Sequence, residues 1–105
     1  MLSNISKTAL TTLGIMIKTA RLERSLSQSD LGERLGVSRQ TVMQLEKGHP
    51  SVGIGIAFEA AYILGIPLLT TDPSNLVHWQ LLLKNFIALL PTRSGRKKIE
   101  IDDDF

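Results

Sequence analysis

The sequence predicts an all-α protein, and three features support that prediction. Apolar residues recur every three or four positions in several separate segments, as they do along one face of a helix. Small polar residues precede these segments and glycine residues follow most of them, and these residue types favour the two ends of a helix. Proline follows two of the segments, at positions 50 and 91, where it prevents the helix from continuing.

The composition restricts the class of protein. The chain has 105 residues, which suits one domain of ordinary size, and 43% of them are hydrophobic, which favours a folded core over wholesale disorder. The absence of cysteine excludes a disulfide scaffold, a thiolate metal site and a cysteine nucleophile. Lys18 interrupts the short apolar run of residues 13–17, and no run reaches the roughly 18 residues of a membrane span. We therefore expect a soluble cytoplasmic protein without a signal peptide.

The first two helices are expected over residues 6–23 and 27–36. Asn4 or Ser6 can cap the first one. Ser27 can cap the second, with Asp30 reaching back to form a capping box, and Gly36 suits the left-handed residue that ends it. The apolar stripes of these helices predict that they pack through Leu10, Leu13, Ile17, Ala20, Leu31 and Leu35.

The third helix is expected to begin after Ser38 and to end at Gly48, and a fourth is expected over residues 54–64. Their inward residues would be Val42, Leu45, Ile56, Ala57, Ala60, Ala61 and Leu64. Residues 66–71 are expected to form one short strand that pairs across a dimer, and Pro67 confines that strand to a sheet edge or a strand start.

The last helical pattern, over residues 75–90, is apolar over much more than one face. Its main stripe consists of Leu76, Trp79, Leu83, Phe86 and Leu90. A helix of this kind is normally buried on several sides, and a small five-helix monomer can hardly cover it, so we expect a dimer or partner interface. The sequence thus divides into an N-terminal helical domain (residues 1–71), this C-terminal helix (72–91) and a flexible basic-then-acidic tail (92–105).

Residues 27–48 form a helix-turn-helix unit, because two short helices are joined there by a tight turn. Gly32 is expected near the helix crossing, where there is little room for a side chain. The exposed N-terminal face of the second helix of the unit can enter the major groove of DNA. Residues 1–50 carry seven basic and four acidic residues, and Arg24 and Lys47 are candidates for contacts with the DNA backbone.

The exposed face of that helix carries groups that can recognise base edges. Arg39 can donate two hydrogen bonds to guanine, and Gln40 and Gln44 can each bond adenine through both amide atoms. Ser38 can bond a base or a phosphate, and Gln28 is placed to bond a phosphate beside free backbone N–H groups. The candidate DNA-binding residues are Gln28, Ser38, Arg39, Gln40, Thr41, Gln44 and Lys47. The alternative reading of the same residues is a solvated helix face.

The stretch LSQSDLGERLGVSRQTVMQLEKG, from Leu26 to Gly48, resembles the DNA-binding unit of the Cro/C1 or Xre (lambda-repressor-like) helix-turn-helix family. The likeness extends over about residues 10–70. It implies a lambda-repressor-like five-helix fold, and it implies an ion pair between Arg21 of the first helix and Glu46 of the third. Gly32 departs from the family pattern, which usually has alanine there.

A narrower resemblance concerns the C-terminal part. The segment after the fourth helix, the extra helix and the ending LPTRSGRKKIEIDDDF look similar to small antitoxins encoded beside HipA-type kinase toxins. This resemblance implies a homodimeric repressor of a palindromic operator that also binds such a kinase. The alternative is a stand-alone or phage-type Xre regulator without a toxin partner.

No feature of the sequence predicts an enzyme, a cofactor or a metal. His49 and His78 have no carboxylate or cysteine at ligand spacing. The Gly53-Ile54-Gly55 stretch lacks the third glycine and the preceding strand of a dinucleotide-binding fingerprint. An activated serine, a carboxylate pair and a metal-ligand cluster are likewise not visible.

Overall fold

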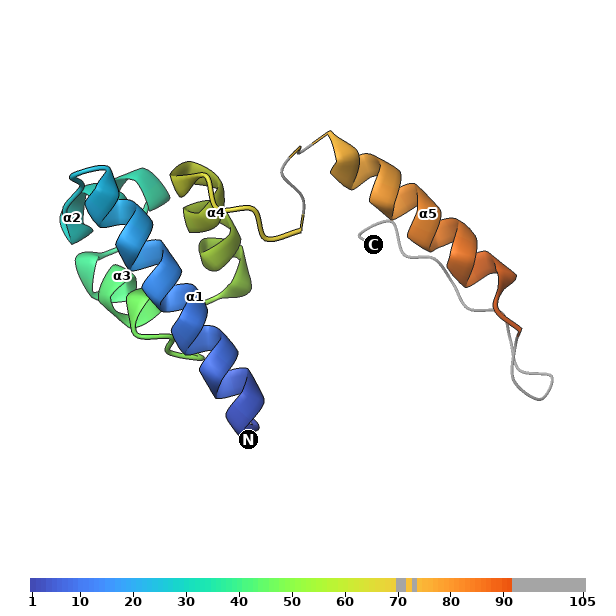
Figure 1. Ribbon diagram of the computed structural model, residues 1–105, viewed down its shortest axis with the longest axis horizontal. Coiled ribbons are helices and arrows are strands. Elements are labelled where there is room, and N and C mark those ends of the chain that lie inside the picture. The colour runs from blue at the N-terminus through green and yellow to red at the C-terminus, as the bar shows by residue number, and fades with distance from the viewer. Residues whose placement is uncertain (70–71, 73, 92–105) are drawn as a thin grey trace. The chain divides into compact units, whose positions relative to one another are not determined.

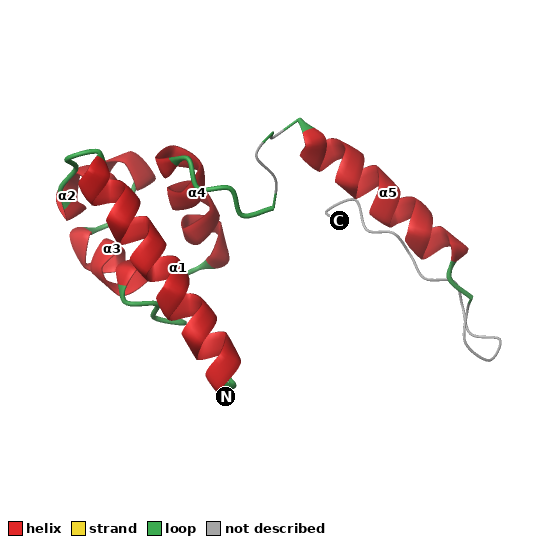
Figure 2. Ribbon diagram, in the orientation of Figure 1, coloured by secondary structure: helices red, strands yellow, loops and turns green. Residues whose placement is uncertain are grey.

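The computed structural model describes residues 1–69, 72 and 74–91, and these residues contain five α-helices and no strand (Figures 1 and 2). The helices are α1 (Asn4–Glu23), α2 (Gln28–Leu35), α3 (Arg39–Glu46), α4 (Ile54–Leu64) and α5 (Asn75–Leu89). The predicted all-α fold is therefore confirmed. The chain divides into two compact units, residues 1–68 and 69–105, which are described separately below.

The first unit holds the hydrophobic core. Helix α1 packs against α3 and α4, and α2 packs against the same two helices. Four side chains from four different helices, Ile17, Leu31, Val42 and Leu64, are almost completely buried. The predicted inward stripes also supply Ala20, Leu45 and Ala60, which are buried, and Leu13, Leu35, Ile56 and Ala57, which pack against the cluster. The predicted Leu10 is not part of this cluster, whereas five residues that were not predicted pack against it: Leu26, Val37, Val52, Ile63 and Ile66.

The helix ends follow the expected chemistry with one difference. Helix α1 begins earlier than predicted, because the Ser3 side chain, rather than that of Asn4 or Ser6, accepts a hydrogen bond from the Ser6 backbone N–H at 3.1 Å. The capping box of α2 is present as predicted: the Asp30 N–H donates to the Ser27 hydroxyl, and the Ser27 N–H donates to the Asp30 carboxylate, both at 2.9 Å. The bonds from the Ser27 N–H and hydroxyl lower the pKa of Asp30.

The strand expected after the fourth helix is not found in residues 66–69, which form a loop, and residues 70–71 lie outside the described residues. A strand needs a neighbouring strand to satisfy its backbone hydrogen bonds, and the described part of a single chain offers none. The tail expected over residues 92–105 also lies outside the described residues.

Helix α5 belongs to the second unit and has no buried residue. This exposure agrees with the expectation that a single chain cannot cover the helix, and the dimer or partner interface expected there stays a prediction. None of the helices that the structure describes is long and apolar enough to cross a membrane.

Candidate nucleic-acid interface

The turn between α2 and α3 is set by backbone geometry that only particular residues allow. Gly36 has φ of 72°, in the left-handed region that favours glycine, and ends α2. The Val37 N–H then donates to the Gly32 carbonyl at 2.9 Å. A Cβ atom on Gly32 would lie 2.8 Å from the Val37 carbonyl oxygen, so the predicted lack of room at the crossing is confirmed. The glycine at position 32 thus fits a tight turn in this chain.

The start of α3 is fixed by Ser38. Its hydroxyl accepts a hydrogen bond from the Thr41 N–H at 3.1 Å and also bonds the Thr41 hydroxyl. On the inner side of α3, Val42 is fully buried and Leu45 is 5% exposed. These contacts hold one face of α3 against the core and leave the other face available for a ligand.

The residues predicted to bind DNA lie on or beside that outer face. Ser38, Arg39, Gln40 and Lys47 are exposed, and Gln28, Thr41 and Gln44 are half-buried. The structure therefore brings all seven residues to the same helix-turn-helix unit. Their contacts with DNA remain predictions.

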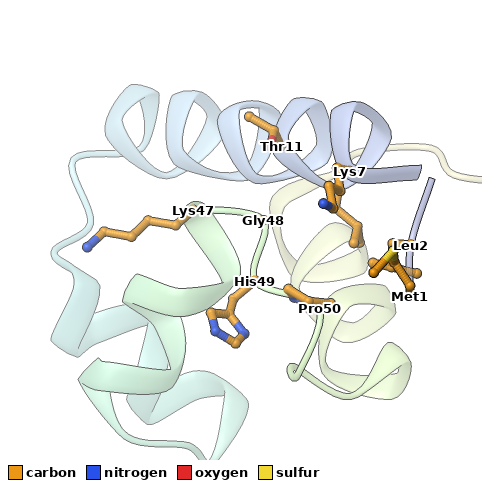
Figure 3. A pocket seen from close by; sticks show the side chains of 9 residues that line it. Met1, Leu2, Lys7, Thr11, Lys47, Gly48, His49 and Pro50 are labelled. Carbon is orange, nitrogen blue, oxygen red and sulfur yellow. The ribbon is translucent and has the colours of Figure 1, made fainter. Parts of the chain in front are cut away.

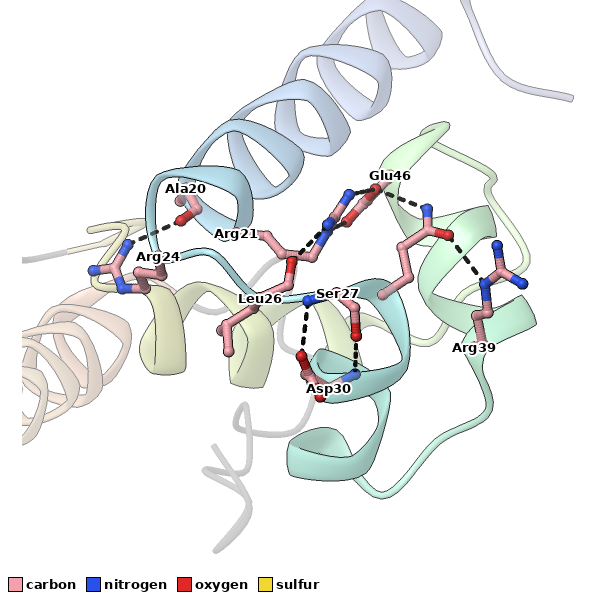
Figure 4. Close-up of polar contacts among 9 residues, drawn as sticks. Ala20, Arg21, Arg24, Leu26, Ser27, Asp30, Arg39 and Glu46 are labelled. Atoms are coloured by element: carbon pink, nitrogen blue, oxygen red, sulfur yellow. Dashed lines mark hydrogen bonds and ion pairs between the residues drawn. The ribbon is translucent and has the colours of Figure 1, made fainter.

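A buried ion pair fixes α3 relative to α1. The Arg21 Nε donates to Glu46 Oε2 at 2.5 Å and its Nη2 donates to Glu46 Oε1 at 3.1 Å, with both side chains almost completely buried (Figure 4). The Arg21 Nη1 donates to the Leu26 carbonyl at 2.8 Å, which ties the α1–α2 connection to the same pair. The pair implied by the family resemblance is confirmed, and its geometry is the bidentate arrangement that arginine favours.

Gln28 links this ion pair to the outer face of α3. Its amide nitrogen donates to Glu46 Oε1 at 3.1 Å, and its amide oxygen accepts a hydrogen bond from Arg39 Nε at 3.4 Å (Figure 4). From the sequence, Gln28 was predicted to bond a phosphate, and these two bonds were not predicted. No signal in the sequence could have found them, because the partners lie 18 and 11 residues away.

The hydrogen bond that Arg39 Nε donates to Gln28 leaves the two terminal nitrogens of the Arg39 guanidinium available. Only the Nε of Arg39 is hydrogen-bonded within the described residues, so its two terminal nitrogens keep their donors. Arg24, by contrast, directs Nη1 to the Ala20 carbonyl at 3.2 Å and lies near Gly65 at the end of α4. Arg39 is therefore placed for an external ligand, whereas Arg24 already contacts its own chain.

Two glycines allow α1 to approach the end of α3 at backbone distance. A Cβ on Gly14 would lie 2.4 Å from the Glu46 carbonyl oxygen, and a Cβ on Gly48 would lie 2.6 Å from the Thr11 nitrogen. Gly48 also has φ of 74° and so fits its predicted role at the end of the third helix. The close approach at Gly14 was not predicted from the sequence, although the place of this glycine in the inward stripe between Leu10 and Ile17 indicates it.

Next to the end of α3, the surface has a hollow of about 540 Å³ (Figure 3). It is lined by Met1, Leu2, Lys7, Leu10, Thr11, Lys47, Gly48, His49 and Pro50. The His49 Nδ1 bonds the Ser51 N–H at 3.1 Å and the Ser51 hydroxyl at 2.7 Å, so the loop structure accounts for this histidine. Across residues 1–69, 72 and 74–91, no group of His, Cys, Asp and Glu side chains could hold a metal ion.

Known proteins are similar to the part of the chain that contains α2 and α3. Residues 17–70, just over half of the chain, match a protein family described as helix-turn-helix. An uncharacterised HTH-type transcriptional regulator of Methanocaldococcus jannaschii is 38% identical over 52 residues, which are 50% of this chain and 79% of that protein. Another, from Methanothermobacter thermautotrophicus, is 44% identical over 50 residues, which are 48% of this chain and 72% of the relative.

No solved structure gave a significant match to the chain. The matched region contains helices α2, α3 and α4, the turn between α2 and α3 and the buried ion pair, and it excludes α5. On the extent of the family match and of the two alignments, the chain belongs to the helix-turn-helix family.

Proposed function

We propose that this protein is a sequence-specific DNA-binding transcriptional regulator that recognises bases with α3. The observation that carries the proposal is the exposed first turn of α3, where Arg39 extends beyond its bond to Gln28 with both terminal nitrogens available. A guanidinium in that state can donate two hydrogen bonds to guanine in the major groove. The two relatives are both described as transcriptional regulators, which supports the same function.

Within this proposal, the residues have different roles. Arg39, Gln40 and Gln44 bond base edges, and Ser38 and Thr41 at the start of the helix contact bases or the adjacent phosphates. Lys47 is exposed beyond the end of α3 and contacts the phosphate backbone. Gln28 uses one amide hydrogen for Glu46 and keeps its second for a phosphate oxygen, while its oxygen restrains Arg39.

The protein acts on its operator as a homodimeric repressor. A dimer would place two α3 helices in successive major grooves of a palindromic site, roughly 34–36 Å apart. The support for a dimer in this chain is the exposed apolar surface of α5, since soluble proteins rarely leave a large apolar patch open to solvent. The family match ends at residue 70, before α5, so dimer formation is argued from this chain alone.

The test begins with DNA selected from a random-sequence library for binding to the full chain. Arg39→Ala is expected to weaken binding to the selected site by about 1–3 kcal/mol, or roughly 5–150-fold, and to relax the preference at one base position. Arg34→Ala on α2 removes the same charge from an exposed residue and serves as the matched control. Failure of the selection to enrich any sequence at moderate salt would contradict the proposal.

A double-mutant cycle tests the link through Gln28. Gln28→Ala is expected to reduce discrimination at the base position that Arg39 recognises, because the guanidinium loses its restraint. The effects of Gln28→Ala and Arg39→Ala should then be clearly non-additive in fluorescence-anisotropy titrations. Lys47→Ala, in contrast, should weaken binding to all sequences alike and reduce the slope of log K against log salt by about one.

A second candidate function is that of antitoxin to a HipA-type kinase toxin. The order of residues after α5, a leucine and proline followed by basic and then acidic residues, favours it. The expected result is that a kinase encoded beside this chain co-purifies with it and is lost when residues 92–105 are removed. Unchanged co-purification would assign the contact elsewhere, and the absence of a kinase-like neighbouring gene would favour a stand-alone regulator.

A further inference from the structure

The N-terminal half of α1 lies against the loop that follows α3. A Cβ atom on Gly48 would lie 2.6 Å from the Thr11 nitrogen and 2.7 Å from the Leu10 carbonyl oxygen, so the two backbones are in direct contact. Lys7 lies one turn before Thr11, and both residues line the hollow of about 540 Å³ beside the end of α3. The family match begins at residue 17, so the place of Lys7 beside α3 is a feature of this chain outside the matched region.

The ionisable side chains that line this hollow are all basic. They are Lys7, Lys47 and His49, and no acidic side chain of the described residues lines it. Lys7 and Lys47 lie on opposite sides of Gly48 (Figure 3). Within residues 1–69, 72 and 74–91, neither lysine side chain forms an ion pair or a hydrogen bond. The hollow therefore offers two unneutralised cations to an anionic ligand.

His49 adds a hydrogen-bond donor to these charges. Its Nδ1 accepts the Ser51 backbone N–H at 3.1 Å, so the proton of the neutral ring is on Nε2. His49 is exposed, and its Nε2 bonds no other group in the part of the chain that the structure describes. This nitrogen can therefore donate to an oxygen of the same anion.

The position of the hollow relative to α3 identifies the anion as the backbone of a DNA duplex. Helix α3 has eight residues and so spans about 12 Å, which is also about the width of the major groove. When the first turn of α3 reaches base edges, its other end and the loop after it lie near the rim of the groove. The phosphates of one strand follow that rim, and lysine side chains neutralise such phosphates in protein–DNA complexes.

We propose that Lys7 of α1, with Lys47 and His49, binds phosphates of the DNA strand at the edge of the groove that α3 enters. Helix α1 then forms a second contact with DNA, outside the helix-turn-helix unit. The inference rests on the proposed function in that it places a duplex against α3. It does not require base recognition, because phosphate contacts carry no sequence information.

The first experiment measures how the affinity of the full chain for a random-sequence duplex depends on salt. Lys7→Ala should reduce the slope of log K against log salt by about one, because one fewer phosphate is neutralised. Lys18→Ala removes another exposed lysine of α1 that does not line the hollow, and it should change the slope clearly less. An unchanged slope for Lys7→Ala, or equal reductions for the two variants, would overturn the proposal.

The second experiment locates the phosphate. In a set of duplexes carrying the selected site, one phosphate at a time is replaced by an uncharged methylphosphonate. Replacement at the contacted position should weaken binding of the unmodified protein and have little further effect on Lys7→Ala, since the charge pair is already lost. If every replacement weakened both proteins equally, Lys7 would contact no phosphate and the proposal would be overturned.

Inorganic phosphate distinguishes a DNA strand from a free anion. The amide resonances of Thr11 and Gly48, which lie in the hollow, should shift when the duplex is added to the full chain. Inorganic phosphate at the same total concentration of phosphate groups should leave them nearly unchanged, because a single small anion lacks the neighbouring charges of a strand. Equal shifts with both would assign the hollow to a small anion and overturn the proposal.

Failure of this inference and failure of the proposed function give different results. If Lys7→Ala lowers the salt slope on random-sequence DNA but the selection enriches no sequence, base recognition fails while the phosphate contact stands. If a sequence is enriched and Lys7→Ala binds it with the slope of the unmodified protein, the phosphate contact fails while the proposed function stands.

Discussion

The helices of residues 1–68 and helix α5 differ in how their apolar content corresponds to their burial. Helices α2 and α3 are eight residues long and mostly polar, yet Leu31 and Val42 are completely buried. Ten of the fifteen residues of α5 are apolar, and none of them is buried. Burial in this protein therefore follows from complementary neighbours and satisfied helix ends, and apolar composition alone does not produce it.

The difference has a polar side as well. In the first unit, a bidentate ion pair, a capping box and two glycines fix how closely helices approach one another. In α5, by contrast, the side chain of the N-cap residue Ser74 bonds no backbone N–H of the helix, and its hydroxyl donates to the Asp72 carboxylate at 2.8 Å. Directional contacts thus fix how the helices of the first unit are oriented, and these contacts tolerate little change. The exposed surface of α5 in the single chain should tolerate substitution more readily.

The largest effect is expected from breaking the buried ion pair. Glu46→Ala leaves the Arg21 charge buried without its carboxylate and should lower the free energy of unfolding by about 3–5 kcal/mol. Glu33→Ala removes an exposed carboxylate of α2 and should change it by less than about 0.5 kcal/mol. Urea unfolding followed by circular dichroism measures both. Equal midpoints for Glu46→Ala and the unmodified protein would show that the ion pair does not stabilise the first unit.

The same substitution in both regions compares them directly. Leu31→Ala removes a fully buried side chain and should lower the free energy of unfolding of the first unit by about 2–5 kcal/mol. Leu83→Ala removes one that is 46% exposed and should leave that free energy nearly unchanged. Native-state hydrogen exchange of the Val42 amide reports the unfolding of the first unit alone. If both variants accelerated this exchange alike, the two regions would fold as one.

Glycine substitutions test how closely the backbones approach. Gly14→Ala places a methyl group against the Glu46 carbonyl and should cost about 1–3 kcal/mol through forced displacement of α1 from α3. Gly55→Ala, on α4 with open space around it, should instead stabilise by about 0.5–1 kcal/mol, because alanine favours the helix. Thermal unfolding distinguishes the two signs. A stabilising Gly14→Ala would mean that the close approach is absent in solution.

The smallest effect concerns the capping box. Because the pKa of Asp30 is lowered in the folded protein, its contribution to stability is present above the unfolded value and is lost as the pH falls through the folded one. Urea midpoints measured from about pH 5 downwards should therefore decline less steeply for Asp30→Asn than for the unmodified protein. Glu33→Gln, on the same helix but without a capping bond, should keep the original decline. If Asp30→Asn left the pH dependence of the urea midpoint unchanged, the capping box would not be the cause of that decline.

Local residue patterns determined much of the first unit. Serine at position 27 with aspartate at 30, glycine at 36 and serine at 38 are sufficient to place the ends of α2 and α3, because capping involves residues only two to four positions apart. The spacing of Leu31, Val42 and Leu45 likewise identified the buried faces, since backbone geometry gives every α-helix the same period. The exposed positions of Ser38, Arg39 and Gln40 follow from the same period.

Only the tertiary structure decided which distant groups meet. The bonds of Gln28 to Glu46 and Arg39, and the contact of Gly14 with the end of α3, depend on how whole helices cross, which no local pattern encodes. Of the extended segment predicted over residues 66–71, residues 66–69 form a loop, because a strand needs a neighbouring strand to satisfy its hydrogen bonds. The dimer or partner interface predicted for α5 stays a prediction, since no residue of this helix is buried in the single chain. The sequence determines which surfaces are apolar, and the arrangement of the helices determines which of these surfaces are buried.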